Sequence, residues 1–326
     1  MAVGIRSITT NQVSGGTGGS ISLTTPSASV GDLLLIILSN DYWQDVMSLT
    51  SITPTATATE ITNFHDDGGN LNGHIMGWTA PVVTGGAVTV VADTGYTAGE
   101  EKILAVYILT GCDTTNPVDD AANTGTMVSS ANPTAPSVSA ANSTSMLFCH
   151  LETDGSGTPG VTVTIPGDTT SQYDVASGGF SRGMGISAQL TTSGGTGGKI
   201  FTAASSFGWI ASSVAINATP TTPAVVTNVV TSITPTTATG NGIVVAANGA
   251  SITERGFVWS TSANPTTSDN KVTVAGTTGG YSGSLTGLSD STLYHVRAYA
   301  INSNGTTYGA DVTFENVGVS AAWITA

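Results

Sequence analysis

The feature that most restricts the fold of this chain is a run of six apolar residues, Leu33 to Leu38, in the segment VGDLLLIILSND. A signal peptide needs a basic region and an apolar stretch of roughly 7–15 residues near the N-terminus, but Arg6 is the lone basic residue before this run. A membrane helix needs about 20 apolar residues, and this run ends at Ser39. A short apolar block between turn residues predicts a strand buried on both faces. We therefore expect a chain that is made and folded without an export signal.

The composition favours an all-β fold. Charged residues make up 9% of the 326 residues, and there are 41 glycines, so long-chain helix formers are few. No segment shows a sustained period of 3.6 residues. Alternating β-branched runs recur between clusters of Gly, Asn, Asp and Pro, which is typical of β-sandwiches and barrels. The length suits two or three such domains.

The charge of the chain argues against nucleic-acid binding. The formal net charge is −14, and residues 1–218 hold 4 basic and 16 acidic side chains, a net charge of −12. Nucleic-acid binding needs clusters of Lys and Arg with aromatic residues among them, and seven basic residues spread over the chain do not build such a patch. We expect neither nucleic-acid binding nor membrane insertion.

A boundary between two domains is expected in the segment NATPTTPAVV, residues 217–226, where Pro220 and Pro223 form a short, fairly stiff linker. The predicted domains are residues 1–218 and residues 219–326, the second ending in a short C-terminal tail. The phrase TSITPT occurs twice, but its flanking residues do not align. We therefore interpret the two copies as shared strand-and-turn chemistry rather than as a repeat.

The second domain carries a specific pattern. In ITERGFVWS, Trp259 and Phe257 lie on one face of a predicted strand, and in LTGLSDSTLYHVRAYA, Leu288 precedes Tyr294 by six residues, with Val296 on the same face as Tyr294. This pattern resembles the fibronectin type III and bacterial immunoglobulin-like (Ig-like) family over about residues 224–315. The resemblance implies a small β-sandwich with a tyrosine corner, whose core includes Trp259, Leu288, Tyr294 and Val296.

The first domain has a weaker outline. The segments VGDLLLIILSND, GHIMGWTAP, KILAVYILTGCD, STSMLFCHLETDG and GWIASSVAIN follow one another in this order. The order resembles a jelly-roll-like β-sandwich found in phage virion proteins and some bacterial surface proteins. The chain departs from that pattern at Cys112 and Cys149, and it lacks the Pro-x-Gly-Trp turn that often follows the first strand.

The two cysteines leave two interpretations open. They do not make a disulfide scaffold in a chain of this length, nor a zinc site, which needs four ligands at short spacings. Cys112 and Cys149 are either two buried small apolar residues or one bridge between core strands that forms after release from a reducing cytoplasm.

The chain shows no catalytic signature, so we expect no enzyme, no cofactor and no metal. The acidic segment FHDDGGN, residues 64–70, lacks the spaced carboxylates of a calcium loop and is better explained as a hairpin tip. Cys149 and His150 are adjacent on a predicted strand and point to opposite faces, so they are not a catalytic dyad.

The expected function is that of a structural virion protein of a tailed bacteriophage, assembled in the host cytoplasm and displayed on the virion surface. We expect a head decoration protein whose first domain docks on the particle and whose second domain projects. The expected partners are the major capsid protein or other virion subunits. With few charges to guard its edge strands, the first domain should also form small homo-oligomers, trimers among them.

Two alternatives remain open. The first is a tail-tube or tail-fibre protein, although neither long repeats nor a coiled-coil stem is visible in the sequence. The second is a carbohydrate-binding adhesin for host attachment, in which exposed aromatic rings stack on glycan rings. The candidates for such stacking are Tyr42, Trp43, Trp78 and Trp209.

Overall fold

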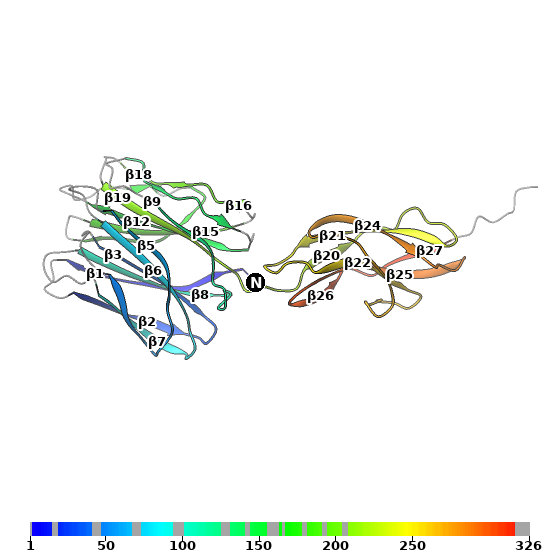
Figure 1. Cartoon of the computed structure of the whole chain (residues 1–326), viewed down its shortest axis with the longest axis horizontal. Helices are drawn as coiled ribbons and strands as arrows, with labels where there is room; N and C mark the ends of the chain where they lie inside the picture. Colours follow the sequence, from blue (N-terminus) through cyan, green and yellow to red (C-terminus); the bar gives the residue numbers. More distant parts are fainter. Residues whose placement is uncertain are drawn as a thin grey trace, which may run out of the picture. The chain divides into compact units, whose positions relative to one another are not determined.

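The fold is all-β, as predicted: every regular element in the described part of the chain is a strand (Figure 1). The structure is a computed structural model. It divides into two compact units, Met1–Thr219 and Pro220–Ala326. The residues that it describes are 2–14, 19–40, 47–66, 73–93, 101–124, 131–140, 144–154, 163–164, 167–177, 181–190, 194–203 and 208–316.

The first half of the first unit is a jelly roll, called here jelly roll 1. Its larger sheet, central sheet 1, has the order β1-β8-β3-β6-β5, and its smaller sheet has the order β2-β7-β4. This is the jelly-roll order, in which strands 1, 8, 3 and 6 form one sheet and strands 2, 7 and 4 belong to the facing sheet. In this protein β5 is added to the edge of the larger sheet. The strands are β1 (Gly4–Ser14), β2 (Ser20–Ala28), β3 (Leu33–Asn40), β4 (Ser48–Thr53), β5 (Thr59–Asp66), β6 (Gly73–Pro81), β7 (Gly86–Asp93) and β8 (Glu101–Thr110).

The second half, jelly roll 2, repeats this topology. Its larger sheet, central sheet 2, has the order β14-β15-β12-β19-β9, and three two-stranded ribbons, β10-β17, β11-β16 and β13-β18, take the place of the smaller sheet. The larger strands are β9 (Val118–Thr124), β12 (Met146–Asp154), β14 (Thr170–Ser177), β15 (Ser181–Gln189) and β19 (Gly208–Ile216). The ribbons contain β10 (Thr134–Ala135), β11 (Ser139–Ala140), β13 (Val163–Thr164), β16 (Gly194–Gly195), β17 (Lys199–Ile200) and β18 (Thr202–Ala203).

The strand register shows that the two halves are equivalent. Leu33 of β3 pairs with Pro81 of β6, and Met146 of β12 pairs with Gln189 of β15 at the equivalent position. The pairing of β3 with β8 and of β12 with β19 matches in the same way. The first unit is therefore an internal duplication, which the sequence analysis did not find.

The β-bulges of the two halves coincide as well. In jelly roll 1 the pairing of β5 with β6 shifts just before the pair Thr62–Gly77. In jelly roll 2 the pairing of β14 with β15 shifts just before the pair Tyr173–Gly185, the equivalent position. The pairings of β1 with β8 and of β9 with β19 also shift at matching positions. Because a bulge adds a residue to one strand and breaks the regular ladder, two coinciding bulges are strong evidence for the equivalence.

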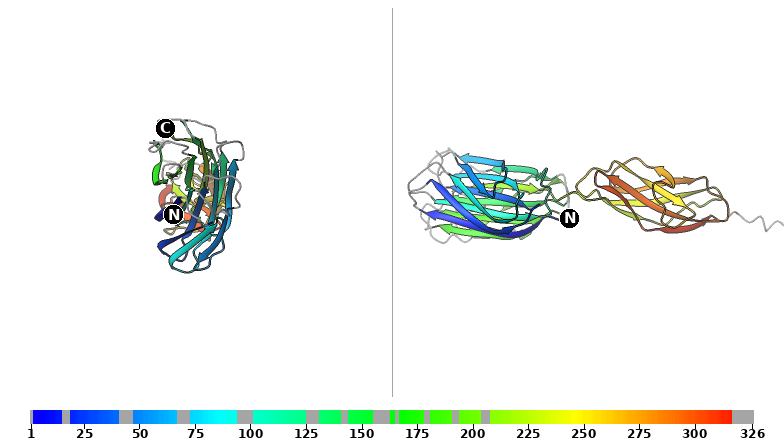
Figure 2. Two further views of the ribbon diagram at one scale, coloured as in Figure 1. Left: turned by 90° about the vertical axis from the view of Figure 1, so that its left-hand side faces the viewer. Right: turned by 90° about the horizontal axis from the view of Figure 1, so that it is seen from below.

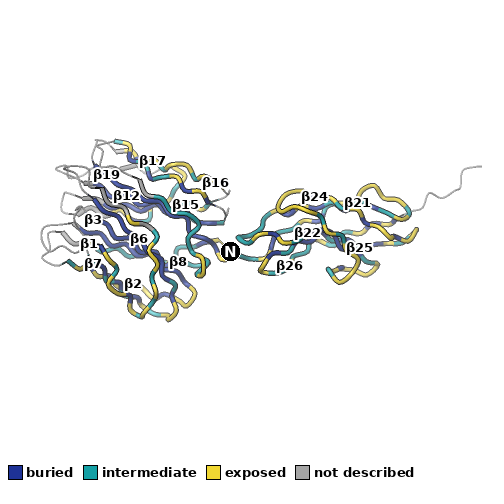
Figure 3. Tube along the Cα trace, viewed as in Figure 1, coloured by how far each residue is buried: buried dark blue, intermediate teal, exposed yellow. Residues whose placement is uncertain are grey.

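The two central sheets pack face to face, so the strands in their middle are buried on both sides. Every residue of β3 and of β19 is buried, as the apolar run at Leu33 predicts. Figure 1 and, from the side, Figure 2 show the first half (blue to cyan) and the second half (green) as neighbouring layers, and Figure 3 shows the central strands as buried. Alternate residues of β3 enter two different cores: Leu34, Ile36 and Leu38 face the smaller sheet, and Leu33, Leu35 and Ile37 face central sheet 2.

The contacts between the two central sheets are reciprocal. Strand β1 packs against β14, and β5 packs against β9, which are the same contact with the two halves exchanged. In addition, the Ser39 hydroxyl donates a hydrogen bond to Oε2 of Glu152 over 2.7 Å, and these two residues occupy equivalent positions of β3 and β12. A residue that bonds to its own counterpart indicates a pseudo-two-fold axis between the halves.

The second unit has the fibronectin type III strand order. One sheet, called here the β24 sheet, has the order β20-β21-β24, and the other has the order β23-β22-β25-β26, with β27 also on β25. The strands are β20 (Ala224–Thr227), β21 (Thr237–Ala246), β22 (Glu254–Ser260), β23 (Asn270–Thr273), β24 (Gly279–Thr286), β25 (Thr292–Asn302), β26 (Gly305–Tyr308) and β27 (Val312–Asn316). The Ig-like fold expected for this region is therefore present.

The tyrosine corner lies where the sequence places it. The backbone N–H of Ser289 donates to the hydroxyl of Tyr294 over 3.0 Å. Trp259, Leu288, Tyr294 and Val296 are all buried in one core between the two sheets. The six-residue spacing of Leu288 and Tyr294 thus places the Tyr294 hydroxyl where it accepts a hydrogen bond from Ser289, and this bond holds the chain just before β25.

Candidate functional site

A buried polar cluster of the first unit lies between the two central sheets. Its members come from both halves: Tyr107 and Ser39 from jelly roll 1, and His150, Glu152 and Tyr173 from jelly roll 2. The Nε2 atom of His150 lies 3.1 Å from the Tyr107 hydroxyl. Burial lowers the pKa of His150 to about 3 and raises that of Tyr107 well above its ordinary value. His150 is therefore neutral at physiological pH.

This cluster is closed to substrates. All five side chains are at most 9% exposed. A Cβ atom on Gly185 would lie 2.3 Å from both the Tyr107 hydroxyl and Cε1 of Tyr173, so a glycine is required for the two rings to approach β15. The polar groups bond to each other across the contact of the two sheets, and they position the halves rather than a ligand.

The cysteines do not form the bridge that the sequence left open. Cys112 and Cys149 are both free and buried, and they belong to different cores. The Sγ atom of Cys149 lies 3.3 Å from the hydroxyl of Ser213. Burial raises the pKa of Cys149 to about 11 and that of Cys112 to about 12. Both thiols pack as small apolar groups, which was the other interpretation.

Two of the four proposed glycan-stacking residues are unsuited to stacking. Trp78 is 5% exposed and Trp209 is 8% exposed, so neither presents the open ring face that a sugar needs. Both residues lie in strands that are covered on both faces. The sequence pattern of a single strand does not show whether its second face is covered, so this burial was not predicted. Tyr42 and Trp43 lie outside the described residues.

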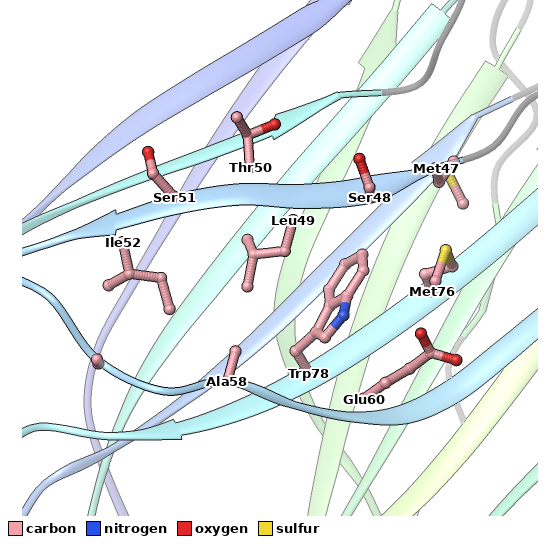
Figure 4. A pocket seen from close by; sticks show the side chains of 11 residues that line it. Met47, Ser48, Leu49, Thr50, Ser51, Ile52, Ala58, Glu60, Met76 and Trp78 are labelled. Carbon is pink, nitrogen blue, oxygen red and sulfur yellow. The ribbon is translucent and has the colours of Figure 1, made fainter.

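Trp78 instead lines a cavity of about 400 Å³ at the open side of jelly roll 1 (Figure 4). The cavity lies between β4 and the β5–β6 pair, and Figure 4 shows the Trp78 ring, Leu49 and Ile52 turned toward one another. Seven of its lining residues are apolar, but polar atoms make up most of the surface that faces the cavity, and Glu60 is the one charged residue in the lining. The lining residues are Met47, Ser48, Leu49, Thr50, Ser51, Ile52, Ala56, Ala58, Glu60, Met76 and Trp78.

In the structure, no hydroxyl group that lines this cavity is hydrogen-bonded to the carboxylate of Glu60. Its hydroxyl groups belong to Ser48, Thr50 and Ser51, and no histidine or cysteine lines it, whereas nucleophilic catalysis needs a base within hydrogen-bond reach of the nucleophile.

No metal centre is found in the part of the chain that the structure describes, where no three His, Cys, Asp or Glu residues lie close enough to hold an ion. Most of the acidic segment 64–70 lies outside the described residues. In that same described part, no helix is long and apolar enough to cross a membrane.

Comparisons with known proteins add little. No protein-family model matches the chain, and no curated protein matches its sequence. Among solved structures, the sensor domain of the anti-sigma factor RsgI4 from Pseudobacteroides cellulosolvens is similar at 14% identity and a TM-score of 0.23, covering 30% of this chain and 77% of that chain.

Two multidomain structures are similar over most of the chain. The chicken CNTN1 FN1-FN3 domains match at 11% identity and a TM-score of 0.25, covering 93% of this chain and 99% of that chain. Domains A168-A170 from titin match at 12% identity and a TM-score of 0.21, covering 97% and 99%. Scores of this size carry no argument about function.

Proposed function

We propose that this chain is a structural virion protein of a tailed bacteriophage, and specifically a head decoration protein that coats and stabilises the particle. The observation that carries the proposal is the duplicated jelly roll of the first unit. Double-sheet jelly rolls occur in viral capsid proteins and in lectins. This step is an analogy of fold, since one fold hosts many functions.

The character of the site favours a structural protein over an enzyme. The polar groups of the first unit bond to one another in a closed interface between two sheets, and no hydroxyl group that lines the described cavity is hydrogen-bonded to its carboxylate, Glu60. The unit consists of four layers of strands that bury one another. In this proposal such a closely packed unit serves to contact neighbouring virion subunits. In this proposal the first unit docks on the shell, with the major capsid protein or other virion subunits as partners.

The Ig-like unit is the part proposed to project from the virion surface. It follows the first unit directly: Thr219 still donates hydrogen bonds to the carbonyl groups of Gly111 and Cys112, and the backbone N–H of Thr221 already donates to the carbonyl of Asn248 in the second unit. Its net charge is only −2, from 3 basic and 5 acidic residues after residue 218. The proposal includes assembly in the host cytoplasm, where virion proteins fold before lysis.

Quantitative mass spectrometry of purified particles tests the proposal. A copy number comparable with that of the major capsid protein is the expected result. A copy number of a few per particle would favour the tail-tube or tail-fibre alternative, and absence from particles would overturn the virion proposal. The adhesin alternative is weakened because Trp78 and Trp209 are buried; it predicts glycan binding that is lost when Tyr42 and Trp43 are replaced by alanine.

A further inference from the structure

The edge strands of this molecule differ in how they are guarded. An edge strand exposes unpaired N–H and C=O groups, and proteins guard such edges with charges, prolines, bulges or very short strands. In the first unit the long edge strands carry bulges, namely β1, β2, β4, β5, β9 and β14. The sequence-based expectation of poorly guarded edges in this unit is therefore wrong, because bulges guard where charges are few.

In the second unit most edges are guarded as well. Strand β20 has four residues and a bulge, and β26 has only four residues. Strand β23 carries Lys271 and β27 carries Glu315. One long edge is left, that of β24.

Strand β24 has no guard. It pairs with β21 through eight consecutive residue pairs without a bulge, and its sequence GGYSGSLT holds neither a charge nor a proline. No backbone hydrogen bond from another described segment reaches residues 279–286 on the side away from β21. Gly279, Gly280, Ser282 and Ser284 are exposed, so the strand is accessible along most of its length.

The outer face of the β24 sheet is uncharged, and its exposed apolar side chains lie on β20 and β21. Val226 and Ile243 are cross-strand partners and are 43% and 38% exposed, and Val245 is 61% exposed. No residue of β20, β21 or β24 is charged. A shallow hollow of about 430 Å³ on this face is lined by Asn228, Asn241, Gly242, Ile243, Gly280, Tyr281 and Ser282.

We infer that the open edge of β24 binds the same strand of a second copy, so that two β24 sheets join into one continuous antiparallel sheet. The charge of the chain favours this occupant. The net charge is −14, and because salt screens charges that lie more than about 10 Å apart, two copies repel each other least where they meet through an uncharged surface. The β24 sheet is such a surface.

The geometry of an antiparallel pair also favours a second copy. An antiparallel contact between two identical strands is self-complementary about a two-fold axis. If the two strands pair so that Gly283 lies opposite Gly283 of the second copy, Tyr281 lies opposite Leu285. Because side chains alternate along a strand, both residues then stay on the face of the joined sheet that packs on the core. The result is a closed dimer in place of the trimers expected from the sequence. This inference does not depend on the proposed virion role.

Sedimentation equilibrium of the full chain tests the inference, over roughly a hundred-fold range of concentration because dimers dissociate on dilution. The wild type should pass from the mass of one chain to the mass of two. Ser284→Lys places a charge on an exposed position of β24 and should remain monomeric throughout. Thr306→Lys, at an exposed position of β26, is the matched control and should behave as wild type. Circular dichroism checks that each variant is folded.

Hydrogen exchange gives a second, local readout. Amides of residues 279–286 should exchange more slowly at high than at low concentration in the wild type, and at one rate in Ser284→Lys. A wild type that stays monomeric, a trimer, or an oligomer that Ser284→Lys leaves intact would each overturn the inference. If β24 is protected by a different protein in particles while the isolated chain is monomeric, the edge serves another partner and the inference is equally wrong.

Discussion

The two jelly rolls share one strand register and the same bulges, yet they bring different chemistry to the interface between them. Jelly roll 1 contributes the aliphatic residues Leu33, Leu35 and Ile37 from β3. The equivalent positions of jelly roll 2 hold Met146, Phe148 and His150, of which His150 is polar, and Glu152 stands where jelly roll 1 has Ser39. The duplication is therefore preserved in backbone hydrogen bonds rather than in side chains.

The difference also shows how the polar half is accommodated. Buried polar groups must find hydrogen-bond partners, and jelly roll 1 supplies them at two positions, the Tyr107 hydroxyl for His150 and the Ser39 hydroxyl for Glu152. The interface thus depends on unequal residues at equivalent positions, and substitutions at such pairs should have unequal effects.

The largest effect is expected at Tyr107, whose equivalent in jelly roll 2 is Val214. Tyr107→Ala removes a ring that is 0% exposed and lies in an edge-to-face contact with Phe148 at 5.2 Å. It should lower the free energy of unfolding of the first unit by about 3–5 kcal/mol. Val214→Ala removes two methyl groups and should cost about 1–2 kcal/mol. Urea unfolding compares the two; equal losses would contradict the asymmetry.

A pH effect is expected from His150, whose equivalent is the non-titrating Ile37. Its pKa is about 3 in the folded protein, against about 6.5 in an unfolded chain. Between these values the unfolded chain binds a proton that the folded chain does not, so stability is complete above pH 6.5 and falls below it. The slope should approach about 1.4 kcal/mol per pH unit.

Comparison of variants isolates this component. In the wild type the unfolding free energy of the first unit should fall between about pH 6 and pH 4. His150→Gln should remove this pH dependence, and His295→Gln in the second unit should leave this pH dependence unchanged. If the wild type and His150→Gln show parallel pH profiles, His150 is already protonated or accessible in the folded state.

A smaller effect is expected at Ser39. Ser39→Ala removes one donor from the buried carboxylate of Glu152 and should cost about 1–3 kcal/mol, the usual penalty for removing one partner of a buried polar group. The exposed Ser51 on β4 provides the control, because Ser51→Ala should change the unfolding free energy by less than about 0.5 kcal/mol. A Ser39 variant as stable as its control would show that the bond at the pseudo-two-fold axis is dispensable.

The smallest effect is expected from oxidation. Cys112 and Cys149 are free, buried and in different cores, and the thiolate is the reactive form of cysteine. Reductant should therefore leave the melting temperature unchanged, and alkylation should label both thiols only after unfolding. Recovery of a Cys112–Cys149 peptide under non-reducing conditions would contradict the structure.

Local patterns predicted individual strands and one corner well. The apolar run at Leu33 and the spacing of Leu288 and Tyr294 are short-range signals, and the buried strand and the tyrosine corner follow from them directly. Both features are set by residues that lie close together in the sequence.

The duplication could not be predicted in this way because strand pairing, not residue identity, is what the halves share. The one visible trace is the similarity of MGWTA, residues 76–80, to MGISA, residues 184–188, which form equivalent parts of β6 and β15. The burial of Trp78 and Trp209 was missed for a related reason: a strand covered on both faces hides residues that an alternating pattern would expose.

The central claim is that the two jelly rolls form one cooperative unit, because each central sheet is buried by the other. Native-state hydrogen exchange in increasing urea measures this most directly, since amides of one cooperative unit share an opening free energy. The amides of β3 and β12 should show the same free energy and the same dependence on urea, and Tyr107→Ala should lower both equally. Exchange of β12 at a clearly lower free energy, while β3 stays protected, would contradict the claim.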